Sequence, residues 1–291
     1  MFYYHIYNYI LATDIKFDML LEFHETISNK KIIYLHINEN CCDTIDFKIS
    51  FSEGISYYIV KPKNSIYVFT ENINLVFISL FNIPMSAYCL LDNRLLLHCN
   101  TLITNNTLFC IGGKKGVGKT TMSLFLSKKY EIYSDDSLSI DNIDNMICGF
   151  SGSDYIKISK NTYDLYINDG KFGDYYNEFS EKAIINLERP MSNPLRLTHF
   201  FYLVRGNIDK PVFTKVNLNA AKASIIIESV LGKNYIDGSL LKNIYKTPLY
   251  DSLIKNVFYY IVTVPELEKY DRKFINNFET VLYRGSNNEK S

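Results

Sequence analysis

The sequence has no excess of charge of either sign, since 31 lysines and arginines balance 31 aspartates and glutamates in 291 residues. Without a basic surplus there is no overall field to attract nucleic acid or an anionic membrane surface, and we expect neither as a partner. Residues 72–91 also lack charge, but the segment contains three Asn, two Ser and a Pro, which are costly in lipid. We therefore predict a buried strand and then a helix there.

Cysteine pairs at the spacing of metal or redox sites are absent, because no C-x-x-C occurs. Scattered cysteines in apolar runs are typical of reduced, buried thiols, so we expect a reducing, cytoplasmic compartment. The segment 1–7 has neither a basic start nor a small-residue cleavage site, which predicts no signal peptide. The six cysteines are Cys41, Cys42, Cys89, Cys99, Cys110 and Cys148.

A phosphate-binding loop is the strongest feature that the sequence does contain. Residues 113–120 read GKKGVGKT and fit the pattern G-x-x-x-x-G-K-[ST]. The apolar run 108–111 before it suits a buried strand, and residues 121–126 place apolar side chains at helical spacing. We predict that phosphate contacts come from Gly113, Lys114, Lys115, Gly116, Val117, Gly118, Lys119, Thr120 and Thr121.

The spacing of the loop follows from the chemistry of phosphate. Glycines let the backbone turn sharply and direct N–H groups at phosphate oxygens, and the following helix adds its positive dipole end. Lys119 would reach the β- and γ-phosphates of a nucleotide, and the Thr120 hydroxyl would hold Mg²⁺. Lys114 and Lys115 could stabilise charge during transfer or be solvated loop lysines.

The rest of the chain divides into three parts by pattern. Residues 1–84 are β-rich, residues 85–284 carry the loop and form a second domain, and residues 285–291 form a disordered tail. The fold class expected is α/β with a mixed sheet. Predicted strands cover 3–11, 31–37, 47–51, 56–60, 65–69, 94–98, 130–134, 137–140, 146–150 and 199–204. Predicted helices cover 18–28, 84–91, 219–230 and 253–262, and turns or loops cover 101–107, 171–177 and 190–194.

Two aspartates and a histidine are the catalytic candidates beside the loop. Asp135 and Asp136 follow Lys119 by one helix and one strand. In a doubly wound sheet they would end a neighbouring strand, beside the phosphates, where a kinase needs a carboxylate for metal and for the acceptor proton. His98 would end the strand before the loop strand, and an imidazole with a pKa of about 6.5 suits acid–base work.

These residues together resemble the carboxyl-terminal domain of the HPr kinase/phosphorylase family. The resemblance rests on Leu-His in 96–99, the loop, and Ser-Asp-Asp in 134–136, and it extends weakly through 149–158, 195–205, the helix near 220 and 262–265. It implies that residues 85–284 form a kinase domain with a P-loop fold related to phosphoenolpyruvate carboxykinase. It also implies Lys119 and Thr120 on phosphate and Mg²⁺, His98 as the active-site histidine, and the pair Asp135 and Asp136 as metal contact and catalytic base. The resemblance does not say which aspartate is the base; we favour Asp135 as the base and Asp136 on the metal.

The resemblance implies an activity and leaves its acceptor open. Such kinases move the γ-phosphate of ATP to a hydroxyl, typically a serine of a protein or peptide, and a homo-oligomer is plausible. The β-rich start is more similar to shorter relatives, including the kinases of lasso-peptide precursors. Two departures are the missing counterpart of a metal-holding Glu and the replacement of Asp-Ser by Lys114 and Lys115.

Three alternatives remain beside a peptide or protein kinase. A small-molecule alcohol could be the acceptor. A non-catalytic nucleotide sensor would keep the loop without turnover, and the missing Glu favours it. A GTPase or transport ATPase is disfavoured because the sequence has neither N-K-x-D nor L-S-G-G-Q.

Overall fold

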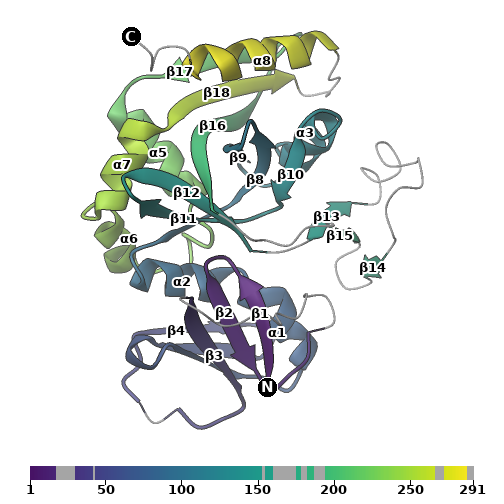
Figure 1. Ribbon diagram of the computed structural model, residues 1–291. Helices are drawn as coiled ribbons and strands as arrows, with labels where there is room; N and C mark the ends of the chain where they lie inside the picture. Colours follow the sequence, from purple (N-terminus) through teal and green to yellow (C-terminus); the bar gives the residue numbers. More distant parts are fainter. Residues whose placement is uncertain are drawn as a thin grey trace.

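The computed structural model describes residues 1–17, 30–41, 43–152, 155–159, 175–177, 182–186, 194–265 and 272–286. Figure 1 shows two large sheets, one above the other, with a small three-stranded sheet to one side. The helix predicted over 18–28 lies outside the described residues, as do Cys42, most of the loops predicted over 171–177 and 190–194, and residues 287–291 of the predicted tail.

The amino-terminal region forms a six-stranded sheet in the order β1-β2-β3-β6-β5-β4. Its residues are rich in the β-branched and aromatic side chains that suit a pleated, half-buried surface. A 3₁₀ turn, Lys61–Lys63, joins β5 to β6. The strands are β1 Phe2–Ile6, β2 Tyr9–Thr13, β3 Lys31–Ile37, β4 Phe47–Phe51, β5 Ile55–Val60 and β6 Ser65–Phe69.

Two predictions in this region are wrong. The run 3–11 is two antiparallel strands, because the chain reverses at Tyr7, which adopts a left-handed φ of 54°. Residues 72–91 form two helices, α1 Ile73–Leu80 and α2 Ile83–Leu91, without the predicted strand. The side chain of Asn72 caps α1 by accepting a hydrogen bond from the backbone N–H of Asn74 at 3.1 Å, and this favours a helix over a strand.

The second sheet is mixed, as predicted, and has nine strands. Its path runs β10-β8-β9-β16-β12-β11-β7, and β18 pairs with both β16 and β17. Strands β9, β16 and β18 run parallel. The strands are β7 Leu95–Leu97, β8 Cys99–Thr104, β9 Thr107–Gly113, β10 Glu131–Ser134, β11 Leu138–Ile143, β12 Met146–Ser151, β16 Leu195–Gly206, β17 Val212–Val216 and β18 Phe258–Pro265.

The largest difference from the sequence prediction in this sheet is strand β8. Residues 101–104, expected in a turn, belong to β8, and the turn itself is only Asn105 and Asn106. Strand β8 pairs with β9 on one side and with β10 on the other, so β10 is not a direct neighbour of the loop strand. Since only one residue separates β7 from β8 although they lie near opposite ends of the path, the sheet curls.

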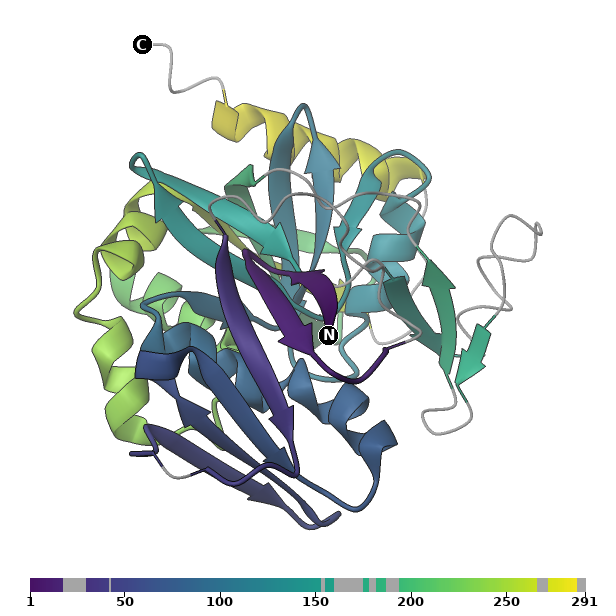
Figure 2. The ribbon, with the colours of Figure 1, turned by 60° about the horizontal axis from the view of Figure 1, so that its bottom comes forward.

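Helices cover both faces of this sheet, as Figures 1 and 2 show. Side chains alternate along β16: Phe200 packs into the cluster with α5 and α7, and Phe201 into the cluster with α3 and α8. The predicted helix 253–262 is wrong in its second half, which is β18. The helices are α3 Lys119–Leu126, α5 Asn219–Ser229, α6 Gly238–Ile244, α7 Pro248–Asn256 and α8 Arg272–Ser286, which continues into the start of the predicted tail.

The third sheet has the order β13-β15-β14. Its strands are β13 Tyr155–Ser159, β14 Tyr175–Asn177 and β15 Lys182–Asn186. Strand β14 occupies the end of the predicted loop 171–177.

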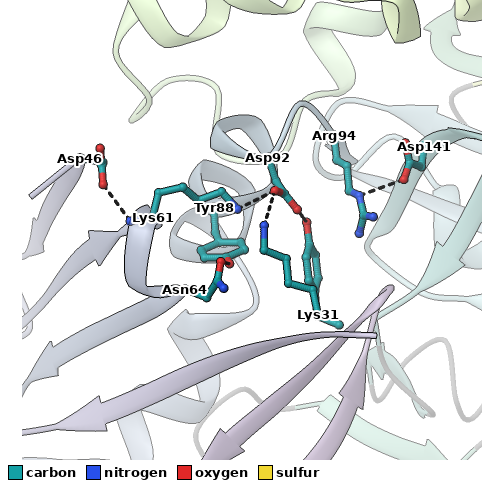
Figure 3. A network of polar contacts seen from close by, with 9 residues as sticks. Lys31, Asp46, Lys61, Asn64, Tyr88, Asp92, Arg94 and Asp141 are labelled. Atoms are coloured by element: carbon teal, nitrogen blue, oxygen red, sulfur yellow. Dashed lines mark hydrogen bonds and ion pairs between the residues drawn. The ribbon is translucent and has the colours of Figure 1, made fainter. Parts of the chain in front are cut away.

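The two large sheets share one apolar cluster and a polar junction. Asp92, at the end of α2, lies 2.7 Å from the Lys31 ammonium and 2.6 Å from that of Lys61, and it accepts a hydrogen bond from the Tyr9 hydroxyl (Figure 3). Burial lowers the pKa of Lys61 to about 8, although Asp92 opposes that shift, so Lys61 stays protonated at neutral pH. Two ammonium groups therefore face one carboxylate where the amino-terminal sheet meets the rest of the molecule.

Two further expectations concern the thiols and a membrane-spanning helix. All five described cysteines are free; Cys41 is partly exposed and the other four are buried, as predicted. Within the described residues, none of the helices has the length and apolar character required to span a bilayer.

Candidate phosphate-binding and catalytic site

The predicted phosphate loop lies between the end of β9 and the start of α3. Gly113, Gly116 and Gly118 have φ values of 142°, 81° and 105°, which L side chains rarely adopt. A Cβ on Gly113 would lie 2.8 Å from Val117 Cγ1 and 2.9 Å from the backbone oxygen of Leu203. The backbone of this segment therefore requires glycine at the position where the sequence pattern has it.

The crest of the loop is open, in contrast to its base. A Cβ on Gly116 would meet no atom within 4 Å, and Lys114 and Lys115 are exposed. Val117 is buried and its N–H donates to the oxygen of Lys114 at 3.3 Å, closing a turn. An anion can approach this crest without displacing a side chain of the loop.

Lys119 folds back over the loop. It is 7% exposed, and its Nζ donates to the backbone oxygens of Gly113 at 3.0 Å and Lys114 at 3.4 Å. Thr120 and Thr121 follow in the first turn of α3 and are half-buried. A cation, a helix amino terminus and a glycine-rich crest together fit a nucleotide phosphate, with the Thr120 hydroxyl as an oxygen ligand for Mg²⁺.

The two aspartates follow β10 and face different surroundings. Asp135 is 5% exposed, and one oxygen accepts a hydrogen bond from the backbone N–H of Lys157 in β13 at 2.7 Å. Asp136 has a left-handed φ of 62°, and its side chain is 50% exposed. The turn after β10 thus directs one carboxylate inward and leaves the other open to solvent.

His98 lies beside the exposed aspartate. Its Nε2 is 3.5 Å from Oδ1 of Asp136, and its backbone N–H donates to the oxygen of Ser229 at 2.6 Å. The prediction that His98 ends the strand before the loop strand is wrong in detail, because His98 joins β7 to β8 and β8 intervenes.

Strand register brings all of these residues to one edge of the sheet. Cys99 at the start of β8 pairs with Gly112 at the end of β9, and Thr101 pairs with Ser134 at the end of β10. Strands β9 and β10 both run antiparallel to β8 and end at the same edge. The predicted neighbourhood of loop, His98 and Asp135-Asp136 is therefore present, by a different strand order from the one expected.

The sequence does not reveal two groups that fix this edge. Tyr7, at the turn between β1 and β2, donates its N–H to the oxygen of Ser151 at 2.9 Å, and its hydroxyl lies 2.9 Å from Oγ of Ser137. Lys157 donates its backbone N–H to Asp135, a contact that any residue except proline could supply. The unusual feature of Tyr7, a left-handed φ at a residue other than glycine, is visible only in the structure.

Comparison with known proteins gives a distant likeness among solved structures. No protein-family model matches the chain, and no curated protein matches it. A solved structure, the Hpr(Ser) kinase/phosphatase from Coxiella burnetii, is similar over 67% of this chain and 99% of that chain, at 12% identity and a TM-score of 0.34. Similarity at that level does not decide the activity of this chain, and the site residues carry the proposal that follows.

Proposed function

We propose that this protein is a magnesium-dependent kinase that transfers the γ-phosphoryl group of ATP to a hydroxyl. One observation carries the proposal: a glycine-rich loop with a buried lysine and a His98–Asp136 pair occupy the same edge of one sheet. Binding alone requires only the loop, whereas transfer also requires a group that accepts the hydroxyl proton. The acceptor favoured by the sequence resemblance is a serine of a peptide or protein, such as a ribosomal peptide precursor.

The residues of the chain divide the work of the transfer. The loop N–H groups and Lys119 hold the phosphates and neutralise charge that develops on the γ-phosphoryl oxygens. Thr120 and the acidic pair would supply oxygen ligands for Mg²⁺, which adds charge neutralisation when it is bound. The acceptor oxygen bonds to the γ-phosphorus, the bond to the bridging oxygen of ADP breaks, and the acceptor proton passes to a carboxylate.

Exposure suggests which carboxylate receives that proton. Asp135 is buried and bonded to the backbone of Lys157, whereas Asp136 is half-exposed and lies beside His98. A hydroxyl arriving from solvent can reach Asp136 without moving β13. We therefore give proton acceptance to Asp136 with His98, in place of Asp135, which the sequence favours.

Substitutions in the phosphate loop and in the His98–Asp136 pair test the proposal. With γ-labelled ATP and serine-containing peptides, Lys119→Ala and Asp136→Asn should each reduce label transfer by at least about a hundredfold. Asp144→Asn is the matched control, because Asp144 is also an exposed aspartate at a left-handed turn position, φ 51°, but in the β11–β12 turn. Label transfer at the native rate in Lys119→Ala and Asp136→Asn would contradict the mechanism.

A nucleotide sensor would give a different pattern. It would show thermal stabilisation by Mg-ATP that depends on Lys119, with no labelled product for any hydroxyl acceptor and no effect of Asp136→Asn. A small-molecule kinase would label an alcohol and leave the peptides unlabelled, with the same dependence on Lys119 and Asp136.

A further inference from the structure

Strand β17 is an open edge of the sheet that carries the phosphate loop (Figure 1). Among the described residues it pairs only with β18, so the backbone N–H and C=O groups on its other side face outward. Val212 is 49% exposed, and Thr214 and Lys215 are exposed as well. An edge strand with accessible backbone groups can accept a further strand from another chain.

The strand register relates β17 to the phosphate loop. Gly113 pairs with Leu203 of β16, which pairs with Val262 of β18. Val262 in turn pairs with Phe213 of β17, so β17 lies in one row with the base of the loop. Since neighbouring strands lie about 4.8 Å apart, a strand added to β17 would lie roughly 19 Å from Gly113. An extended chain covers that distance in about six residues.

The direction of β17 also leads toward the site. Strand β17 runs antiparallel to β18, whereas β18, β16 and β9 all run parallel. A strand that pairs antiparallel with β17 therefore runs in the same direction as β9, which leads into the phosphate loop. The chain that continues from the carboxyl end of the added strand leaves the sheet at the edge where the loop, His98 and Asp136 lie.

The side chains of β17 indicate the chemistry of the added strand. Lys215 is the charged residue of β17, and its ammonium lies 5.2 Å from the ring centre of Phe258. No residue of β17 is acidic, so a carboxylate opposite Lys215 on the added strand would meet a charge of opposite sign. Val212 and Thr214 share the other face, where β-branched neighbours pack well.

We propose that β17 binds an extended segment of the acceptor peptide as an additional antiparallel strand. This proposal rests on the kinase function proposed above. The bound segment carries a carboxylate opposite Lys215, and the serine that receives the phosphoryl group lies roughly six or more residues toward the carboxyl end of the peptide. Recognition of the peptide is therefore separated in space from the transfer.

Binding is measured first, without ATP, by the fluorescence anisotropy of a labelled peptide. The probe contains the segment TVEVT, a spacer of about eight glycine and alanine residues, and one serine. The matched probe carries N-methyl groups on the backbone nitrogens of the segment, which remove the hydrogen-bond donors and keep the side chains. It should bind at least about tenfold more weakly. Equal binding of the two probes, or no binding of the first at about 1 mM, overturns the proposal.

Charge reversal then assigns the contact to β17. Lys215→Glu should weaken binding of the first probe at least about threefold, and a probe with lysine in place of its glutamate should recover that loss. Lys48→Glu is the matched control, because Lys48 is also an exposed lysine of an edge strand, β4 of the other sheet, and lies 5.0 Å from the ring centre of Tyr58. Equal effects of the two substitutions overturn the proposal.

Transfer from γ-labelled ATP tests the predicted geometry. The first probe should have a KM at least about tenfold lower than a probe with a spacer of about two residues or one with the serine before the segment. Lys119→Ala should abolish labelling and leave peptide binding intact. Binding with no label in any peptide contradicts the kinase function, and with it the identification of the bound segment as acceptor. Label that depends on neither the segment nor the spacer overturns the docking proposal alone.

Discussion

At the scale of single residues, a histidine that is 2% exposed among aromatic rings titrates differently from one in water. Desolvation, first, and the positive charge of Lys215, second, lower the pKa of His199 from 6.5 to about 4. The unfolded chain then binds a proton at higher pH than the folded one. The stability that comes from a neutral His199 is complete above pH 6.5 and is lost as pH falls toward 4.

Replacement of His199 should therefore reduce the loss of unfolding free energy as pH falls below 7. Between about pH 7 and pH 5 the native protein should lose about 2 kcal/mol more unfolding free energy than His199→Phe, which has no proton to bind there. Urea unfolding at the two pH values measures this difference. His5, whose pKa burial and Lys30 also lower to about 4, is present in both proteins and cancels. Equal pH dependence would mean that His199 titrates normally.

At the scale of elements, the phosphate loop depends on backbone that only glycine adopts at low cost. Gly113 combines a positive φ with close contacts to Val117 and Leu203, whereas Gly54, in the β4–β5 turn, has a φ of 78° and open space around its Cβ position. Both glycines need a positive φ, but only at Gly113 would a Cβ atom also meet neighbouring atoms. Comparison of the two separates backbone strain from the shape of the loop.

Alanine at these two glycines should have unequal effects. Gly54→Ala should lower the unfolding free energy by about 1 kcal/mol, from the left-handed conformation alone. Gly113→Ala should cost about 3 kcal/mol, because the methyl group also meets a side chain and a backbone oxygen. Urea unfolding gives both values, and thermal stabilisation by Mg-ATP should survive only in Gly54→Ala. Preserved nucleotide binding in Gly113→Ala would show that the loop can shift to admit the methyl group.

At the scale of the whole molecule, the amino-terminal sheet reaches the candidate catalytic edge. Tyr7 lies fully buried, with its hydroxyl 2.9 Å from Ser137, the residue after Asp136, and a Cβ on Gly152 would lie 2.1 Å from its ring. The backbone N–H of Ser137 in turn donates to the oxygen of Asp135 at 2.7 Å. The turn that carries both aspartates is thus held from the other sheet.

Loss of the Tyr7 hydroxyl should therefore slow phosphoryl transfer as well as lower the unfolding free energy. Tyr7→Phe should lower the unfolding free energy by about 1 kcal/mol and label transfer by about tenfold. Tyr57→Phe is the matched control, because it removes another buried hydroxyl of the same sheet, one whose partners Ser79, at 2.7 Å, and Val76, at 3.3 Å, lie in α1. Equal transfer rates in the two variants would show that Tyr7 serves folding alone.

The sequence by itself determined the phosphate loop, the strand and helix around it, and the identity of the nearby polar residues, because these features are local. A glycine pattern, an apolar run and a helical period require no partner to be recognised. The sequence also predicts β3 to β6 and α5, because their apolar residues recur at the spacing of a strand or a helix. Asn72 before α1, and Thr247 and Pro248 at the start of α7, are also local signals, because they mark where a helix begins. The boundaries between helix and strand after these residues lie within continuous apolar runs, and a sequence pattern does not locate them.

Only the tertiary structure decided what stands beside the loop. Strand β8 separates β9 from β10, the turn at Tyr7 persists because Ser151 and Ser137 bind it, and the sheet curls so that His98 meets Asp136. It also decided the exposure of the two aspartates and the burial of His199. Each depends on contacts between residues far apart in the chain, whose free energy comes from packing and hydrogen bonds that no local pattern contains.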